Sequence, residues 1–199
     1  MGNRVPDIVP GLSAQRASFL RDLNYTSCIS INLALSRRPA AETSFVVVPG
    51  PVSEGLFAII LEHNKVARRC PDGKGLCTMF MLNEWSVAHA EDDDETILAA
   101  MIGEVEKALP GIGDDIEFIR VIRWYPVLVY SHPGLYRKLG RFHAGRDRSA
   151  RIHLAGSYNS SGNVNTATVT GERSARELVD SLEGRVPTSI KPTLAAAAL

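Results

Sequence analysis

The chain has 199 residues, which is enough for one large domain or two small ones. Lysine plus arginine and aspartate plus glutamate are equal at 22 each, so the zero net charge gives no electrostatic basis for binding nucleic acid or an anionic membrane. No apolar run is long enough to span a bilayer and residues 1–11 lack the apolar core of a signal peptide, so we expect a cytoplasmic protein.

The first 82 residues predict one short helix followed by four strands. Prolines and a glycine mark residues 6–11 as loop, and residues 14–23 are typical of a short helix. Runs rich in β-branched and large apolar residues predict strands at 27–35, 44–50, 56–64 and 76–82. Prolines and glycines separate these runs, which indicates an antiparallel or mixed sheet.

The clearest helix follows, in DDETILAAMIGEVEKALPG at residues 93–111. Asp93 or Asp94 caps its start and Pro110 with Gly111 ends it. Apolar side chains recur on one face at Ile97, Met101, Val105 and Leu109. Beyond it we expect a strand over 116–130, ending in a turn, and a helix over 134–142.

The last ordered region is predicted as a strand over 151–155, a small polar loop over 157–162, and a helix that begins at Asn163 or Asn165 and ends at Leu182. The first acidic residue of this helix is Glu172, well beyond its first turn. The free N–H groups and the positive dipole at the N-terminus are therefore available to a hydrogen-bond acceptor of a ligand. Small residues recur at Ala167, Gly171 and Ala175 and indicate a close approach by a flat group or another backbone, although an ordinary packed junction is the alternative.

The remaining polar residues support no metal site. The three cysteines Cys28, Cys70 and Cys77 lack zinc-site spacing, and we expect reduced structural thiols. None of the five histidines lies in a metal-binding spacing. The basic run over 137–151 is typical of a solvated surface, with contact to acidic substrate groups as the alternative.

Residues 151–178, RIHLAGSYNSSGNVNTATVTGERSAREL, resemble the C-terminal motif of FAD-dependent oxidoreductases of the amine oxidase, protoporphyrinogen oxidase and phytoene desaturase superfamily. The matching positions are Leu154, Ala155, Gly156, Val164, Ala167, Gly171, Glu172 and Ala175. Weaker similarity extends over 5–35, 69–81 and 123–139. The resemblance implies FAD as cofactor, and it implies that the flavin is held by Gly156, Ser157, Val164, Asn165 and Ala167.

The resemblance also implies the fold. We expect an α/β protein of α+β character, in which a mixed or antiparallel sheet with helices forms a substrate domain and a C-terminal strand and helix belong to an incomplete FAD-binding domain. The expected parts are an entry segment (1–25), a substrate-domain-like region (26–135), the FAD-domain strand and helix (136–185) and a flexible tail (186–199).

The implied activity is hydride transfer from a substrate to FAD. Trp124, Tyr130, His132 and Tyr136 are the candidates for contact with an apolar or porphyrin-like substrate, and no catalytic residue is assigned. Ser157 replaces the acid usual in the family and Asn163 replaces an aromatic of the amine oxidase substrate cage. The chain also has no lysine before Lys65. These departures favour porphyrinogen oxidase or carotenoid desaturase types over amine oxidases.

The motif G-x-G-x-x-G, with which the family binds the ADP half of FAD, does not occur. Either another chain supplies that half or the sequence is a truncated gene product. The alternative function is a non-catalytic remnant, or a subunit that binds a partner flavoprotein or an apolar ligand.

Overall fold

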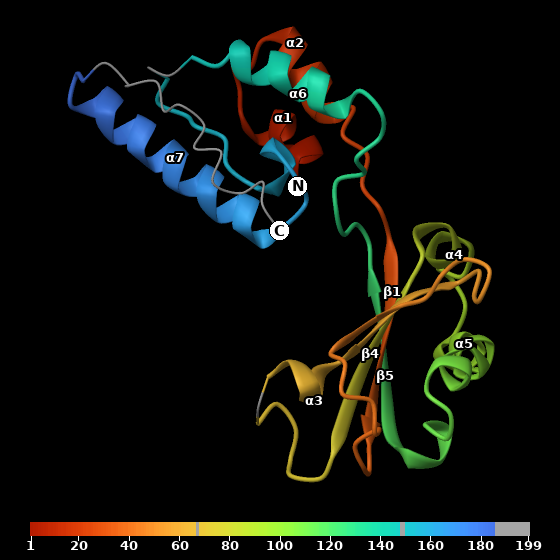
Figure 1. The fold of residues 1–199 in the computed structure, drawn as a ribbon. Helices are drawn as coiled ribbons and strands as arrows, with labels where there is room; N and C mark the ends of the chain where they lie inside the picture. The colour runs from red at the N-terminus through yellow and green to blue at the C-terminus, as the bar shows by residue number, and fades with distance from the viewer. Residues whose placement is uncertain (67, 148–149, 186–199) are drawn as a thin grey trace. The chain divides into compact units, whose positions relative to one another are not determined.

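The computed structural model describes residues 1–66, 68–147 and 150–185 (Figure 1). The chain forms two compact units. The sheet unit is Thr26–Val127, and the helical unit combines Met1–Tyr25 with the described residues from Leu128 on. The functional boundaries expected at 25 and 135 stay predictions.

The helical unit contains four α-helices in the part of the chain that is described. They are α1 (Val5–Ile8), α2 (Ala14–Arg21), α6 (Leu135–Ala144) and α7 (Val164–Leu182). Short 3₁₀ turns span Gly2–Arg4 and Ser157–Asn159. Its apolar core gathers Val5, Leu20, Leu23, Val129, Leu135, Leu139, Phe142 and Tyr158. The predicted helices at 14–23, 134–142 and 163–182 are confirmed within a few residues.

The sheet unit has five strands, β1 (Cys28–Leu35), β2 (Phe45–Val47), β3 (Leu56–Leu61), β4 (Gly75–Met81) and β5 (Ile116–Trp124). Their order is β2-β3-β4-β1-β5, and every pairing is antiparallel. The helices are α3 (Glu62–Lys65), α4 (Asn83–Ala88) and α5 (Asp94–Ala108), with a 3₁₀ turn at Gly113–Asp115. The α/β class with an antiparallel sheet is therefore confirmed.

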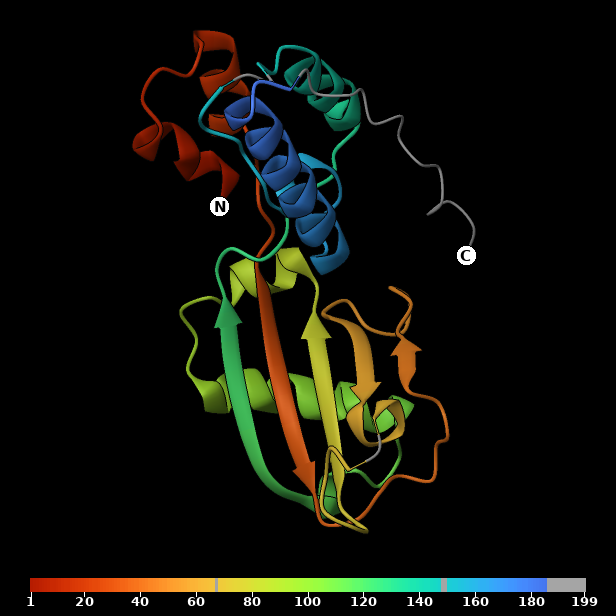
Figure 2. The same cartoon turned by 90° about the vertical axis from the view of Figure 1, so that its left-hand side faces the viewer.

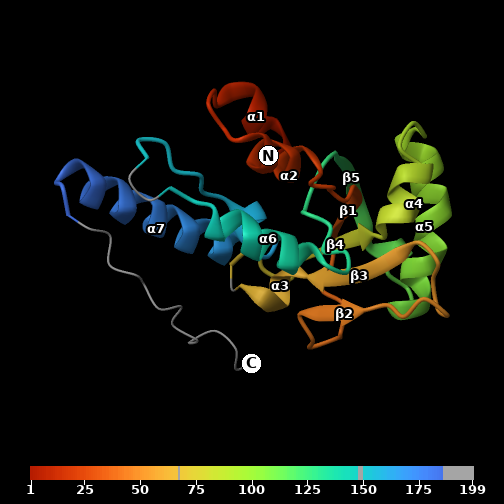
Figure 3. The ribbon, with the colours of Figure 1, turned by 90° about the horizontal axis from the view of Figure 1, so that it is seen from above.

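The core of the sheet unit lies between one face of the sheet and α5. On β1 the odd-numbered residues Ile29, Ile31 and Leu33 are buried there, as the period of two in a strand requires. From α5 the buried side chains are Ile97, Met101 and Val105. Helices α4 and α5 lie on the same side of the sheet (Figures 1 and 3), and α5 crosses behind the strands in Figure 2. The opposite face is bordered by α3 alone among the unit's described helices.

The start of α5 follows directly from its sequence. The Asp93 carboxylate accepts a hydrogen bond from the Thr96 N–H at 2.8 Å, which satisfies one free donor of the first turn. This bond holds the pKa of Asp93 below its ordinary value, because it favours the charged carboxylate. The predicted cap and the predicted apolar face of the helix are both confirmed.

Three predicted strands need correction. Residues 62–64 belong to α3 rather than to a strand, since Glu, His and Asn lack the β-branched character of the preceding run. The strand predicted over 116–130 ends at Trp124, one residue before Tyr125-Pro126, where proline has no N–H to give to a ladder. Residues 151–155 form no ladder within the described chain, because the contacts of this segment go to α7 side chains instead.

No helix in the described ranges is both long and apolar enough to cross a membrane. The tail predicted over 186–199 lies outside the described residues.

We predict that Leu33→Ala, which empties a fully buried site between the sheet and α5, lowers the free energy of unfolding by about 2–5 kcal/mol. Phe118→Ala is the control on β5, because 67% of Phe118 is exposed, and it changes the stability by less than about 1 kcal/mol. Urea unfolding followed by tryptophan fluorescence measures both, since the only tryptophans, Trp85 and Trp124, lie in the sheet unit. Equal losses for the two variants would contradict the assigned core.

We also predict that Cys77 does not react with iodoacetamide at pH 8.5 in the folded protein. Burial raises the pKa of its thiol to about 12, so only about one molecule in three thousand carries the reactive thiolate. Mass spectrometry of the alkylated protein checks this, with the chain in urea as the reference. Alkylation at the same rate in both states would show that the thiol is accessible.

Candidate functional site

Helix α7 is attached to the preceding chain through polar side chains. Its buried residues are Thr170, Ser174 and Glu177, and none of them is apolar. The Thr170 hydroxyl oxygen accepts a hydrogen bond from the Gly156 N–H at 3.0 Å, and it lies 2.8 Å from the Thr166 carbonyl oxygen. The Ser174 hydroxyl donates to the Leu154 carbonyl at 3.2 Å. These two hydrogen bonds hold residues 154–156 alongside α7.

The loop between this segment and α7 is closed by its own polar groups. Gly156 has φ 134°, a backbone conformation that favours glycine, and a Cβ there would lie 2.9 Å from the Tyr158 ring. The Asn159 side-chain amide Nδ2 donates to the Leu154 backbone carbonyl at 3.2 Å. The backbone carbonyl of Asn159 accepts from His143 Nε2 at 2.8 Å. The turn Ser157–Asn159 is therefore fixed from both sides.

The N-terminus of α7 is capped and exposed. Asn163 is the N-cap, and its side-chain oxygen accepts from the Thr166 N–H at 2.8 Å. The Val164 and Asn165 N–H groups occupy the first two helical positions, which have no acceptor inside a helix. Val164 is 83% exposed, and the first turn carries no acidic residue. A negatively charged or carbonyl-bearing group can therefore approach this end.

The five predicted cofactor residues share this region. Gly156 and Ser157 begin the loop, Val164 and Asn165 begin α7, and Ala167 follows half-buried one turn into the helix. Their assignment to a cofactor stays a prediction. A Cβ at Gly171 meets no described atom within 4 Å, so no backbone of the described chain packs there, and the close approach of a flat group stays a prediction.

Three of the predicted substrate residues lie in the helical unit. The Tyr130 and His132 rings are 6.4 Å apart between centroids, and Tyr136 lies in the first turn of α6 with 56% of its surface exposed. His132 Nδ1 is 2.9 Å from the carbonyl oxygen of Pro133. Tyr130 and His132 are thus neighbours on an exposed stretch of chain.

The fourth predicted substrate residue, Trp124, lies at the end of β5 in the sheet unit. Its indole N–H donates to the Ser30 hydroxyl of the adjacent β1 at 2.9 Å, which turns the ring along the sheet face opposite α5. This face, which we call the open face, presents Phe45, Val47, Ile60, Phe80, Phe118, Ile122 and Trp124. Four of these side chains are about half exposed or more, namely Phe45, Val47, Phe118 and Trp124.

Polar side chains form a narrow strip on the open face. The Thr78 hydroxyl of β4 lies 3.0 Å from the side-chain oxygen Oδ1 of Asn32 on β1 and 3.4 Å from Glu62 Oε1. Glu62 is 9% exposed and forms an ion pair with Arg69. The sequence analysis missed this strip, although Ser30, Asn32 and Ala34 alternate with buried aliphatic residues in β1 and so marked a second face.

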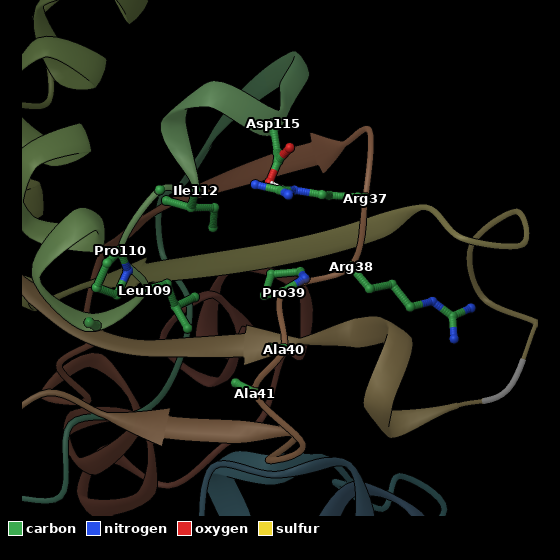
Figure 4. Close-up of a pocket in the computed structure, with 11 residues that line it drawn as sticks. Arg37, Arg38, Pro39, Ala40, Ala41, Leu109, Pro110, Ile112 and Asp115 are labelled. Carbon is green, nitrogen blue, oxygen red and sulfur yellow. Dashed lines mark hydrogen bonds and ion pairs between the residues drawn. The ribbon is translucent and has the colours of Figure 1, made fainter.

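A surface cavity of the sheet unit has a volume of about 430 Å³ (Figure 4). It lies between the segment Arg37–Ala41 and the end of α5, over Leu109 and Ile112. Arg37 Nε donates to the Asp115 carboxylate at 2.7 Å, and Arg38 Nε donates to the Lys74 carbonyl at 3.0 Å. Both guanidinium groups thus have partners on the protein. In the described part of the chain no group of His, Cys, Asp and Glu side chains can hold a metal ion.

Comparison with known proteins gives a family and a fold. The family model of flavin containing amine oxidoreductases matches residues 5–179. The solved structure of a protein described as a protoporphyrinogen oxidase from Exiguobacterium sp. 255-15 matches with a TM-score of 0.67 at 14% identity, over 92% of this chain and 40% of that one. Cyclohexylamine oxidase from Brevibacterium oxydans IH-35A gives 0.70 at 16% identity, over 92% and 42%. Reduced UDP-galactopyranose mutase gives 0.67 at 11% identity, over 94% and 41%.

At these identities the likeness to solved structures shows the fold alone. The chain spans about two fifths of the length of these structures. No curated protein matches the chain significantly.

We predict that Thr170→Val releases the loop at Gly156 from α7. The valine has nearly the same volume but offers no acceptor, so the Gly156 N–H loses its hydrogen bond at a cost of about 1–3 kcal/mol. Hydrogen exchange at the Gly156 amide measures the effect and should accelerate. Thr168→Val is the control, because the Thr168 hydroxyl bonds only within the helix, to the Val164 carbonyl. Unchanged exchange at Gly156 in Thr170→Val would refute the role of the hydroxyl.

Proposed function

Because the chain belongs to the family of flavin-containing amine oxidoreductases, we propose that it forms the flavin-facing and substrate-facing part of an FAD-dependent oxidoreductase. The proposed reaction is hydride transfer from a substrate carbon to the flavin. The observation that supports this most directly is the N-terminus of α7, exposed, free of acidic residues and placed next to the loop that begins at Gly156.

The residues present fit a flavin. The N–H groups of Val164 and Asn165, together with the helix dipole, favour negative charge at the end of the helix. Gly156 adopts a backbone conformation that favours glycine, the Tyr158 ring fills the space that a Cβ would need, and the Gly156 N–H is bound by Thr170. A bound flavin supplies the hydride acceptor, and the chain stabilises the negative charge that reduction brings. Gly156, Ser157, Val164, Asn165 and Ala167 are the residues that we propose hold it.

For the substrate we propose an apolar or porphyrin-like molecule. The open face supports this, because it combines aromatic and aliphatic side chains with a narrow polar strip around Thr78. Trp124 belongs to that face, while Tyr130, His132 and Tyr136 are proposed substrate contacts from the helical unit. Asn163 at the start of α7, where amine oxidases carry an aromatic residue, favours porphyrinogen oxidase or carotenoid desaturase types over amine oxidases.

Tight binding of FAD needs a domain that holds the ADP half of the cofactor. The chain has no G-x-G-x-x-G motif, and it spans about two fifths of the solved structures that it resembles. We therefore propose that the domain that binds the ADP half of FAD lies outside these 199 residues, for example on a separate chain.

A non-catalytic subunit that binds a partner flavoprotein is the second candidate. One observation favours it, namely that aliphatic side chains on α7 face solvent. Val169, Val179 and Leu182 are 54%, 46% and 63% exposed, and Ile152 next to the helix is 54% exposed. A helix gains most of its stability from packing an apolar face, so these residues suit a covering domain.

The proposal predicts opposite effects of Asn165→Asp on stability and on binding. An acid at the second helical position stabilises the helix by about 0.3–1 kcal/mol through the dipole. The same charge repels a reduced flavin, so affinity for the reduced form should fall about tenfold while affinity for the oxidised form changes less. Flavin titrations in both redox states, monitored by fluorescence and absorbance, measure this.

Thr168→Asp is the matched control, because Thr168 is exposed on the same helix but lies beyond its first turn. It should leave flavin affinity unchanged. The experiment is done with the chain alone and together with a dinucleotide-binding domain. If neither sample binds flavin, the oxidoreductase proposal fails, and if Asn165→Asp and Thr168→Asp weaken binding equally, the proposed site fails.

A further inference from the structure

A second cavity lies entirely within the helical unit. It has a volume of about 420 Å³ and is lined by residues 9–13 and by the chain around Gly145 and His153. The predicted flavin residues 156–167 do not line it. Four basic side chains reach its wall, Arg16 from α2, Arg146 from the end of α6, and both Arg151 and His153 from the segment before Gly156.

One buried carboxylate, Glu177, contacts two of these side chains. It accepts from Arg146 Nη2 at 2.6 Å, and its other oxygen lies 3.3 Å from His153 Nδ1. Arg16 Nη1 donates to the Gly145 carbonyl at 3.2 Å, and its guanidinium lies 4.4 Å above the Phe142 ring. No carboxylate in the described ranges forms an ion pair with Arg16. Asp147 is the acidic residue on the cavity wall.

Three of the four side chains also keep a buried nitrogen without a hydrogen-bond partner among the described residues. These atoms are Arg16 Nε, Arg146 Nε and His153 Nε2. The His153 side chain is only 4% exposed, so water reaches it poorly. Buried polar atoms in native proteins are nearly always paired, and the residues around this cavity keep three unpaired nitrogens against one unpaired oxygen, Glu177 Oε2, so donors are left over for an acceptor-bearing ligand.

The arginines around this cavity act on one another and on nearby His143 through their positive charge. The pKa of Arg16 is lowered, first by burial and then by the nearby charge of Arg146. The pKa of His143, which is packed next to this region, is lowered first by burial and then by Arg173, Arg146 and Arg16. Guanidinium groups that repel one another in a partly buried site are stabilised by an anion between them.

We propose that this cavity binds a small organic anion, recognised through phosphate or carboxylate oxygens by Arg16, Arg146 and His153. Arginine suits this chemistry, because its planar donors match the geometry of both groups. The cavity is larger than an inorganic phosphate needs, so the ligand carries an organic part beside its charge. Arg137, Lys138, Arg141 and Arg151 of the basic run are exposed, as predicted for a solvated surface, whereas Arg146 pairs with the buried Glu177.

The test is calorimetric titration of the full chain with pyrophosphate, glycerol phosphate and citrate, each against sodium chloride at equal ionic strength. We expect saturable binding of at least one anion, about tenfold weaker in Arg16→Gln. Arg21→Gln is the matched control, since Arg21 lies on the same helix and pairs with Asp7 on the surface, and it should bind like the wild type. Binding of the phosphates alone or of citrate alone supports the site and identifies the ligand group.

A second measurement is independent of any variant. The imidazole signals of His153 and His143 in the wild-type chain are followed by NMR during the same titrations, and His153 should shift with the calorimetric affinity while His89 in the sheet unit stays unchanged. Absence of saturable binding, equal binding in Arg16→Gln and Arg21→Gln, or binding without a His153 shift would each overturn the proposal. The flavin experiments above do not involve this cavity, so the two proposals fail separately.

Discussion

The hydrogen bonds between α7 and residues 154–156 are the interactions on which the candidate site depends. The Thr170 hydroxyl accepts from the Gly156 N–H, and the Ser174 hydroxyl donates to the Leu154 carbonyl. A buried helix face that is wholly polar gains little from the hydrophobic effect, but its hydrogen bonds are directional. Such a face specifies the register between loop and helix more narrowly than apolar packing would. The N-terminus of α7 and the loop from Gly156 are therefore held in one fixed relation.

In the sheet unit, one face of the five-stranded antiparallel sheet is covered by helix α5 and the other is not. The open face carries large apolar side chains in contact with solvent, which costs solubility unless a ligand or partner uses it. The Trp124–Ser30 bond and the Thr78–Asn32 contact fix polar positions within this apolar surface. An apolar substrate with a few polar groups is the ligand for which such a surface is suited.

Much of this could be predicted from local sequence. The Asp93 cap and the apolar face of α5 depend on neighbouring residues only, and both were predicted correctly. The strand at 151–155 was wrong because a strand exists only beside a partner, which no local pattern contains. The close approach expected at Gly171 stays a prediction, since no other described segment packs against that residue and the approaching group would come from outside the described chain. The cavity at Arg16, Arg146 and His153 could not be predicted, because three separate segments supply its donors.

The central claim is that the loop from Gly156 and the start of α7 form a flavin site. Backbone amide NMR of the labelled chain titrated with FAD tests it most directly. The account predicts that the largest shifts fall on Gly156, Ser157, Val164, Asn165 and Ala167 and that amides along α5 stay unchanged. Shifts confined to other regions, or none at saturating FAD with the dinucleotide-binding domain present, would contradict it.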